Sequence, residues 1–313
     1  DAEEEEAFHS LRQEFEVSWQ KLLDQSLGEA VTTEGVELNF LANISVPAEI
    51  DQVHRFGASG VGLFRTEYLY MNQASFPDEE IQFEAYQKVI SGAAPGVATI
   101  RTLDIGGDKE LPYLCFVKEA NPFLGWRSIR FCLDNPDIFR TQLRALLRAS
   151  TAGNLRMMFP MISTLAELRQ AKAHLQAVQD ELTQEGIAFD QNMEVGIMIE
   201  VPSAAMIADQ LAREVDFFSI GTNDLTQFTL AVDRTNQKLA DRFCSFSPGV
   251  LRIIDLVVRA AQKQGISVSC CGEMTGQPLG FLLLLGLGVR DFSCNLFAVP
   301  QMKKMMDGVE LAE

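Results

Sequence analysis

Eight short runs rich in β-branched and other apolar residues are spread along the chain, and they alternate with longer, helix-like stretches. Because a helix between two strands is the usual crossover between parallel neighbours, this alternation predicts a parallel sheet. Eight strand–helix units over residues 30–313 favour a closed α/β barrel, the (β/α)8 or TIM barrel, with an open doubly wound sheet as the alternative. The predicted strands cover residues 36–43, 60–64, 98–103, 155–159, 195–199, 217–220, 267–270 and 291–293.

Three segments predict long helices. Residues 126–150 and 165–184 lie between predicted strands, and the second carries leucines at helical intervals. Residues 1–28 have apolar side chains at roughly helical spacing and an acidic start, which suits the positive end of a helix dipole. We expect this first helix to pack its apolar stripe on a neighbour. The chain is therefore expected to consist of a linker helix at residues 1–29 and a barrel at residues 30–313.

The charge balance argues against some classes of function. The chain has 26 Lys and Arg against 43 Asp and Glu, a net charge of −17 at pH 7. Such a surface would not displace counterions from phosphates, so we expect no nucleic-acid partner. The longest apolar stretch, residues 278–289, is shorter than the ~20 residues of a membrane-spanning helix, and no signal segment opens the chain. The chain starts at Asp1, which suggests a fragment of a longer protein.

The six cysteines and three histidines show no metal-ligand spacing. No C-x-x-C pair occurs, and no histidine has a neighbourhood that marks a catalytic base. Adjacent cysteines such as Cys270 and Cys271 rarely form a relaxed disulfide. We therefore expect reduced thiols in a cytoplasmic protein.

Residues capable of chemistry follow the predicted strands. Three of them are arginines, Arg65, Arg101 and Arg234. Arginine binds phosphate or carboxylate through a planar, permanently charged fork. A single arginine is commonly a salt-bridge partner, but three directed at one barrel mouth favour an anionic ligand, because active sites lie at the carboxyl ends of barrel strands. A cleft can focus a local positive field despite the net negative charge.

Two carboxylates, Glu200 and Asp224, also follow apolar strands. Burying either without a partner would be costly. Together with substrate oxygens and water they would make a magnesium site, and pairing with the arginines is an equal alternative. The Gly106-Gly107 pair could bind an anion, serve as a lid or form only a turn. Arg127 could reach the mouth or sit in the first turn of a helix.

Cys271 ends the seventh predicted strand beside Gly272 and Glu273. A thiol at this place can give a proton to a carbon centre at neutral pH. Cys270 points the opposite way by strand alternation and is expected to be a small buried hydrophobe.

Four segments together resemble enzyme I of the bacterial phosphotransferase system, and they occur in the same order. The resemblance covers roughly residues 30–313 and corresponds to the phosphoenolpyruvate (PEP)-binding half of that family, a (β/α)8 barrel. The segments are Gly62-Leu63-Phe64-Arg65-Thr66-Glu67, Arg101-Thr102-Leu103-Asp104-Ile105-Gly106-Gly107-Asp108-Lys109, Phe217-Phe218-Ser219-Ile220-Gly221-Thr222-Asn223-Asp224-Leu225-Thr226-Gln227 and Cys271-Gly272-Glu273.

The resemblance implies a role for each matching position. The phosphate of PEP would be held by Arg65, Arg101 and Arg234. Asn223 and the backbone at Asp224 would orient the substrate, while Glu200 and Asp224 would bind Mg²⁺. Cys271 would protonate the enolate carbon to give pyruvate. Lys109 and Arg127 match positions near the substrate.

The resemblance also implies partners. The family's phosphoryl acceptor is a histidine on a separate N-terminal domain, and no histidine here resembles it. Residues 1–29 would then be the linker from that missing domain. The predicted function is that of a PEP-protein phosphotransferase, a first step in sugar transport that feeds the HPr phosphocarrier protein, and family members form homodimers through this half.

Other functions are compatible with the same barrel fold. Pyruvate phosphate dikinase and PEP synthase have this barrel, although residues 105–109 and 231–234 look more like enzyme I. A magnesium-enolate lyase or aldolase, or a sensor that binds PEP without turnover, are further alternatives. Thr275 and Gln277 depart from the enzyme I pattern. These departures affect the expected fine adjustment of the activity more than the activity itself.

Overall fold

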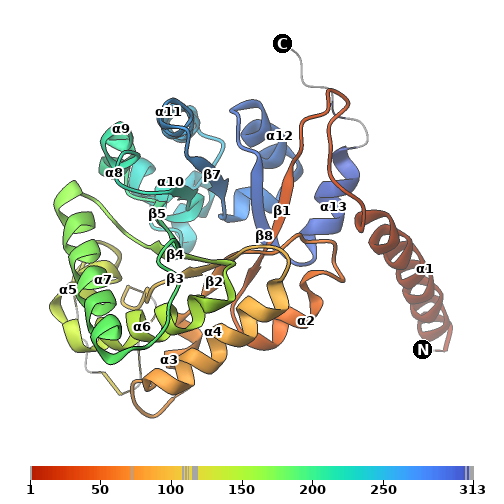
Figure 1. The fold of residues 1–313 in the computed structure, drawn as a ribbon. Helices are drawn as coiled ribbons and strands as arrows, with labels where there is room; N and C mark the ends of the chain where they lie inside the picture. The colour runs from red at the N-terminus through yellow and green to blue at the C-terminus, as the bar shows by residue number, and fades with distance from the viewer. Residues whose placement is uncertain are drawn as a thin grey trace.

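The computed structural model describes residues 2–306 and 309, apart from 72, 108, 110, 112 and 115–118. In this part of the chain, eight strands pair in parallel in chain order, and the last returns to the first (Figure 1). This closure confirms the predicted (β/α)8 barrel and excludes the open doubly wound sheet. The strands are β1 (Asn39–Ile44), β2 (Val61–Arg65), β3 (Ala98–Arg101), β4 (Leu155–Phe159), β5 (Glu194–Ile199), β6 (Phe217–Ile220), β7 (Ser267–Cys270) and β8 (Asp291–Asn295).

Helices surround the barrel and connect its strands, as Figure 1 shows. The longest of those that pack around it, α7, begins at a capping box in which Thr164 and Glu167 exchange side-chain and backbone hydrogen bonds, and it ends before the left-handed Gly186. The helices are α1 (Ala2–Ser26), α2 (Ile50–Val53), α3 (Glu67–Met71), α4 (Glu79–Ala93), α5 (Ile129–Asp134), α6 (Pro136–Ala149), α7 (Leu165–Glu185), α8 (Pro202–Met206), α9 (Ala208–Leu211), α10 (Thr222–Leu230), α11 (Pro248–Gln264), α12 (Pro278–Gly286) and α13 (Ala298–Met305).

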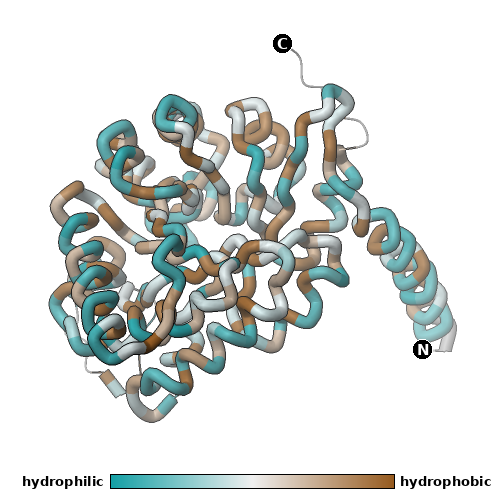
Figure 2. The backbone as a smooth tube through the Cα atoms, in the orientation of Figure 1, coloured by the Kyte–Doolittle hydropathy of each residue, from teal (hydrophilic) through white to brown (hydrophobic). Residues whose placement is uncertain are grey.

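The apolar core has two parts. The larger part fills the layer between the strands and the surrounding helices. A small cluster of Leu63, Met158, Met198, Phe217 and Cys271 is separate from it. Figure 2 shows apolar residues both in the barrel and in the helices around it. Three members of this small cluster, Leu63, Met198 and Cys271, also line the cavity described below.

The prediction of one helix over residues 126–150 was wrong. The segment forms two helices, α5 and α6, which meet at Asn135 and Pro136. Proline cannot donate a backbone hydrogen bond, and it disfavours helical angles in the residue before it. Asn135 accordingly has φ −123° and ψ 67°, and both its backbone N–H and its side chain donate to the Phe131 carbonyl.

Two strands are shorter at one end than predicted. The strand expected over 36–43 begins only at Asn39, because Glu37 pairs with Val31 in an isolated antiparallel bridge. The strand expected over 98–103 ends at Arg101. The next residues leave the sheet, and the Leu103 N–H donates to the Gln142 side chain.

The expected packing of the first helix is only partly right. The carboxyl-terminal end of α1 packs on the barrel near α13, where Leu23 and Ser26 are buried and Trp19 contacts Phe297. The rest of α1 projects away from the barrel (Figure 1), and Phe8, Leu11 and Phe15 are 63–67% exposed. Among the described residues, no helix combines the length and apolar character needed to span a membrane.

Candidate functional site

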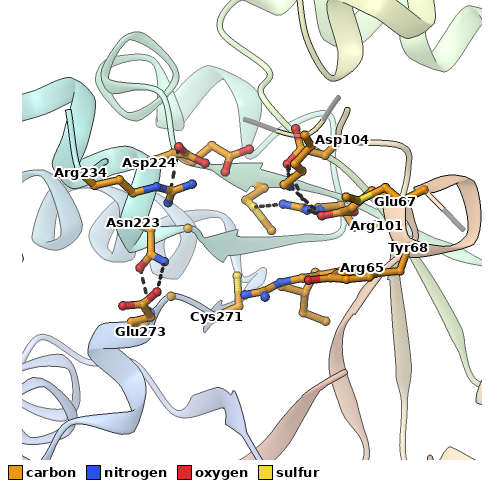
Figure 3. Close-up of a pocket in the computed structure, with 17 residues that line it drawn as sticks. Arg65, Glu67, Tyr68, Arg101, Asp104, Asn223, Asp224, Arg234, Cys271 and Glu273 are labelled. Carbon is orange, nitrogen blue, oxygen red and sulfur yellow. Dashed lines mark hydrogen bonds and ion pairs between the residues drawn. The ribbon is translucent and has the colours of Figure 1, made fainter. Parts of the chain in front are cut away.

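A cavity of about 350 Å³ opens where the carboxyl ends of five strands meet. It is lined by residues on or after β2, β3, β5, β6 and β7, as expected for a barrel active site. Figure 3 shows Arg65 and Arg101 entering from one side and Arg234 from the opposite side, with Cys271 between them. The lining residues are Leu63, Arg65, Glu67, Tyr68, Met71, Arg101, Asp104, Lys109, Met198, Glu200, Gly221, Asn223, Asp224, Arg234, Cys271, Gly272 and Glu273.

The structure brings eight of the nine predicted site residues to this cavity. They are Arg65, Arg101, Lys109, Glu200, Asn223, Asp224, Arg234 and Cys271. The ninth, Arg127, is not among the lining residues. It is fully buried, and its guanidinium group lies 3.0 Å from Asp104 and 3.6 Å from Asp224. Arg127 therefore stands behind the two carboxylates and joins them.

The side of the cavity formed by the segments after β2 and β3, here the β2–β3 wall, is a network of buried ion pairs. Arg101 Nη2 lies 2.7 Å from Glu67 Oε1 and 3.0 Å from Asp104 Oδ2. Lys109 Nζ bridges the same two carboxylates at 2.7 and 2.8 Å. Glu67 and Asp104 are each 1% exposed. Glu67 thus contacts two cations, and Asp104 contacts three when Arg127 is included, so neither charge is buried alone.

This network sets the protonation of its acids. Burial alone would raise the pKa of Glu67, but the charges of Arg101 and Lys109 outweigh it and hold the pKa below its usual value. Burial opposes ionisation of Asp104 too, yet Arg127, Lys109 and Arg101 hold its pKa well below the ordinary value. Both acids are therefore ionised at neutral pH.

The Gly106-Gly107 pair forms a turn, which was one of its three predicted alternatives. The backbone groups of Gly106 and Lys109 exchange hydrogen bonds of 3.0 and 3.2 Å. Gly106 has φ +95°, and a Cβ there would lie 2.6 Å from the Cβ of Arg127. Glycine is required at this place, and the turn returns Lys109 to the carboxylates of Glu67 and Asp104.

The opposite side of the cavity, formed by residues after β5 and β6 and here called the β5–β6 wall, is paired less completely. Glu200 is 1% exposed, and its Oε1 accepts a hydrogen bond from the Met161 N–H at 2.7 Å. Burial first, and then the negative charges of Asp224 and Asp104, raise its pKa. Asp224 Oδ1 is buried and has no hydrogen-bond partner among the described residues, with Arg234 at 3.9 Å.

This donor set fits a magnesium ion. Mg²⁺ is commonly held by one or two carboxylates, with water and substrate oxygens completing its coordination. Asp224 has a buried oxygen without a hydrogen-bond partner among the residues described, and the raised pKa of Glu200 shows that its negative charge is disfavoured in this environment. A bound divalent cation would favour the charged form. In the described part of the chain, no group of three or more His, Cys, Asp or Glu residues could hold a metal. Substrate oxygens and water would therefore have to supply the remaining ligands.

Phe123 connects the arginines of the two walls. Its ring lies 5.9 Å from the guanidinium carbon of Arg127 and 5.7 Å from that of Arg234. Phe123 belongs to a short 3-10 helix, Pro122–Leu124, in the segment after β3. A cation close to a ring face is attracted by the ring's quadrupole. The ring therefore helps to hold Arg234 in place from the other side of the barrel mouth.

Cys271 lies on the floor of the cavity and is 3% exposed. Burial raises the pKa of its thiol, while Arg101 and Arg65 act in the opposite direction. The thiol is therefore protonated at neutral pH and faces positive charge. Cys270 is fully buried in the larger core, as its predicted alternation requires, and it accepts a hydrogen bond from Thr275 at 3.3 Å.

Asn223 is held in one orientation by Glu273. The Asn223 Nδ2 donates to Glu273 Oε1 at 3.1 Å, and the Glu273 N–H donates to Asn223 Oδ1 at 3.0 Å (Figure 3). This reciprocal pair fixes which end of the amide carries the donor. It also joins the segments that follow β6 and β7.

Sequence reasoning did not select three charged residues of the site, Glu67, Asp104 and Glu273. All three lie just after strands and inside the quoted motifs, so their position carried the signal. They were missed because the position of an acid after a strand does not reveal its partner: Glu67 and Asp104 meet cations, whereas Glu273 pairs with the Asn223 amide.

Comparisons with known proteins agree with this geometry. Residues 19–311 match the family described as PEP-utilising enzyme, PEP-binding domain. A phosphoenolpyruvate-protein phosphotransferase of Geobacillus stearothermophilus is 49% identical over 291 residues, which is 92% of this chain and 50% of the relative. One of Bacillus subtilis (strain 168) is 49% identical over 281 residues, 90% of this chain and 49% of the relative. The chain thus spans about half the length of these relatives.

Solved structures share the fold at much lower sequence identity. A malate synthase of Haloferax volcanii has a TM-score of 0.54 and 12% identity, covering 88% of this chain and 70% of that chain. A citrate lyase of Burkholderia xenovorans LB400 has a TM-score of 0.51 and 16% identity, covering 86% of this chain and 77% of that chain. These likenesses support the barrel fold alone.

Proposed function

The chain belongs to the PEP-utilising enzymes, of which it carries the PEP-binding domain, and on this premise we propose that it is the substrate-binding part of a PEP-protein phosphotransferase. In this role the barrel mouth binds PEP and presents its phosphoryl group to a histidine on another domain. The remaining enolate is then protonated to pyruvate. The observation that carries the proposal is the convergence of Arg65, Arg101, Arg234 and Cys271 on one cavity.

The arginines account for binding and for transfer. PEP carries its charge on a phosphate and a carboxylate, and guanidinium groups match both. Phosphoryl transfer proceeds through a loose transition state, so catalysis depends on positioning and charge neutralisation. Arg101 is already fixed by Glu67 and Asp104, which leaves little reorganisation for the reaction. The Asn223 amide, oriented by Glu273, would align the substrate beside it.

Glu200 and Asp224 are the residues that would hold Mg²⁺. The ion would neutralise charge on the phosphate and the enolate oxygen. The Asp224 oxygen that lacks a hydrogen-bond partner in the described structure would be free to bind the ion, and the charge of the ion would lower the raised pKa of Glu200. Lys109 adds a further positive charge at the cavity and is restrained by the β2–β3 wall.

Cys271 would deliver the proton. When the bridging P–O bond of PEP breaks and the acceptor nitrogen bonds to phosphorus, an enolate remains. Its terminal carbon then takes the proton from Cys271 Sγ, which breaks the S–H bond, forms the C–H bond and leaves a thiolate that water reprotonates. The raised pKa keeps the proton on sulfur until it is needed, and Arg65 and Arg101 favour the resulting thiolate.

The acceptor is proposed to lie outside this chain. His54 hydrogen-bonds to the Ala58 and Ala94 carbonyls, His174 lies on α7, His9 lies on α1, and none of them lines the cavity. We therefore propose a phosphohistidine domain preceding the α1 linker, transfer onward to the HPr phosphocarrier protein, and a homodimer. The free thiols among the described cysteines are consistent with a reducing, cytoplasmic location.

Calorimetry of PEP binding in the presence and absence of Mg²⁺ tests the proposed site. We expect Mg²⁺-dependent binding that falls by at least about 100-fold in Arg65→Ala, because a charged hydrogen bond to phosphate is lost. Arg259→Ala, which removes an exposed arginine on α11, is the matched control. Equal affinity in Arg65→Ala and the wild-type chain would refute the arginine site.

A second experiment tests the proton donor. A separately produced phosphohistidine domain is added, and pyruvate formation is measured in the wild-type chain, in Cys271→Ala and in Cys244→Ala. Cys244 is an exposed thiol and serves as the control. We expect a loss on the order of 100-fold in Cys271→Ala alone. Full activity of that variant would mean that another group delivers the proton.

A further inference from the structure

Behind the β2–β3 wall lies a chain of buried polar side chains that does not reach the cavity. Its members are Thr66, Tyr70, Gln82, Tyr86 and Gln142, and each is at most 1% exposed. They come from the segment after β2 and from α3, α4 and α6. A fully buried polar cluster between helices and strands is costly unless every group is hydrogen-bonded. We therefore expect the polar groups of this cluster to be paired with one another or with the backbone.

Gln142 is the centre of this cluster. Its Oε1 accepts a hydrogen bond from the Leu103 N–H at 2.8 Å. Its Nε2 donates to Thr66 Oγ1 at 3.3 Å and to the Tyr86 hydroxyl at 3.0 Å. Thr66 Oγ1 in turn donates to the carbonyl of Arg101 at 2.9 Å. Gln142 thus holds the backbone on both sides of Thr102, directly at the Leu103 N–H and through Thr66 at the Arg101 carbonyl.

The backbone needs this support because the sheet ends here. The last sheet-like bond is from the Thr102 N–H to the Met158 carbonyl. The Leu103 N–H points to Gln142 instead, one residue before Asp104. Arg101 and Asp104, whose side chains lie 3.0 Å apart at the cavity, are therefore attached to a stretch of chain that Gln142 fixes.

The other arm of the cluster reaches α3. The Tyr86 and Tyr70 hydroxyls both donate to Gln82 Oε1, at 3.0 and 2.8 Å. Tyr70 lies on α3, one turn after Glu67, which lines the cavity. Because Gln142 donates to both Thr66 and Tyr86, each of these hydroxyls must direct its own proton away, toward Arg101 or Gln82. The direction of every hydrogen bond is thereby determined, and the cluster has a single arrangement.

We propose that Gln142 is a positioning residue for the anion site: it sets Arg101 and Asp104 at the cavity through their backbone without touching the substrate. This inference rests on the proposed function, because it assumes that Arg101 binds the phosphate. At metal sites, groups that orient a ligand from behind commonly change affinity or activity by 10–100-fold when they are removed, and we expect an effect of the same kind on Arg101. A side chain with only a packing role would lower stability and leave affinity unchanged.

The test compares the buried side chain of Gln142 with the half-buried side chain of Asn154, which also makes hydrogen bonds but lies at the opposite end of the barrel. Gln142→Met keeps length and volume and removes all three hydrogen bonds. Asn154→Leu is the matched control. Asn154 lies just before β4, at the amino end of the strands, and its side chain donates to the Ile90 and Gly96 carbonyls. For each variant, PEP affinity with Mg²⁺ is measured by calorimetry and stability by urea unfolding.

We expect Gln142→Met to bind PEP about tenfold more weakly, while Asn154→Leu loses stability and keeps the wild-type affinity. Thr66→Val, which removes one arm while keeping the shape, should weaken binding several-fold, and it carries the test if Gln142→Met does not fold. Wild-type affinity in Thr66→Val or Gln142→Met would overturn the inference, as would an equal loss in Asn154→Leu.

The same data separate this inference from the proposed function. Failure of the wild-type chain to bind PEP would refute the function and, with it, the role of Gln142. Tight binding by the wild-type chain that is lost in Arg65→Ala but retained in Gln142→Met would refute only the positioning role.

Discussion

The two walls of the cavity are built from the same kinds of residue but differ in how their charges are balanced. In the β2–β3 wall, Glu67 contacts two cations and Asp104 contacts three, all at 2.7–3.0 Å, and the pKa values of both acids are lowered. In the β5–β6 wall, the pKa of Glu200 is raised, and Asp224 meets arginines only at 3.6 and 3.9 Å.

This difference indicates what each wall does. A wall whose ion pairs are complete can hold Arg101 and Lys109 in place before any ligand arrives, so it is prepared for an anion. A wall with an unpartnered carboxylate oxygen and like charges in proximity is stabilised by adding a cation. The first wall should therefore govern stability and anion affinity, and the second should govern metal dependence.

The largest predicted effect on stability is at Asp104. Asp104→Asn removes the carboxylate shared by Arg101, Lys109 and Arg127, and it leaves the buried Arg127 with only the more distant Asp224, at 3.6 Å, as an ion-pair partner among the described residues. We expect it to lower the free energy of unfolding by about 3 kcal/mol. Urea unfolding at pH 7 measures this. Asp255→Asn, which removes a partner of Arg259 on the exposed face of α11, is the control and should have a much smaller effect. Equal losses in the two variants would contradict a structural role for the β2–β3 wall.

Glu200→Gln should have the opposite profile. Removing an acid whose charged form is disfavoured by burial should leave stability without metal unchanged or higher. Mg²⁺-dependent PEP binding should fall on the order of 100-fold, because the proposed metal site would lose one of its ligands. The two readouts are urea unfolding in EDTA and calorimetry. A large loss of stability in this variant would show that Glu200 is a structural ion-pair partner.

The two walls should also respond oppositely to pH in the absence of metal. Glu67 and Asp104 have lowered pKa values, so their contribution is present above the unfolded values of 4.5 and 3.8 and is lost as pH falls through the folded values. Glu200 has a raised pKa, so its contribution is present below 4.5 and is lost as pH rises through the folded value.

Unfolding free energies measured between about pH 3 and pH 9 would separate these contributions. Asp104→Asn should flatten the loss of stability on the acid side, and Glu200→Gln should flatten it on the alkaline side. If the unfolding free energy depended on pH in the same way in both variants and in the wild-type chain, folding would not shift the pKa of either carboxyl group.

The smallest predicted effect concerns the link between the walls. Phe123→Leu keeps an apolar side chain but removes the ring that faces Arg127 and Arg234, and we expect PEP affinity to fall about fivefold. Phe123→Tyr keeps the ring and should bind like the wild-type chain. No change in the leucine variant would show that the ring only fills space.

The sequence predicted the barrel well because strand and helix periods are local signals. The predicted strands 155–159, 217–220 and 267–270 agree residue for residue with β4, β6 and β7. The errors arose where other interactions prevail over local preference. Pro136 divided a predicted helix, and the Gln142 side chain took the Leu103 N–H that a longer β3 would have used.

The candidate site was predictable to the extent that strand ends share one edge of a barrel. Position alone brought Arg65, Glu200 and Cys271 to one cavity. It could not show that Arg127 lies behind Asp104, because that depends on how far a long side chain extends and which partner it finds. The exposed stripe of α1 was likewise unpredictable, since periodicity indicates an apolar face and not what covers it.

A crystal structure of the chain with PEP and Mn²⁺ in place of Mg²⁺ tests the central claim most directly. We predict an anomalous peak between Glu200 and Asp224, with the phosphate against Arg65, Arg101 and Arg234 and the methylene carbon facing the Cys271 sulfur. PEP bound outside this cavity, or a metal peak away from both carboxylates, would contradict the account.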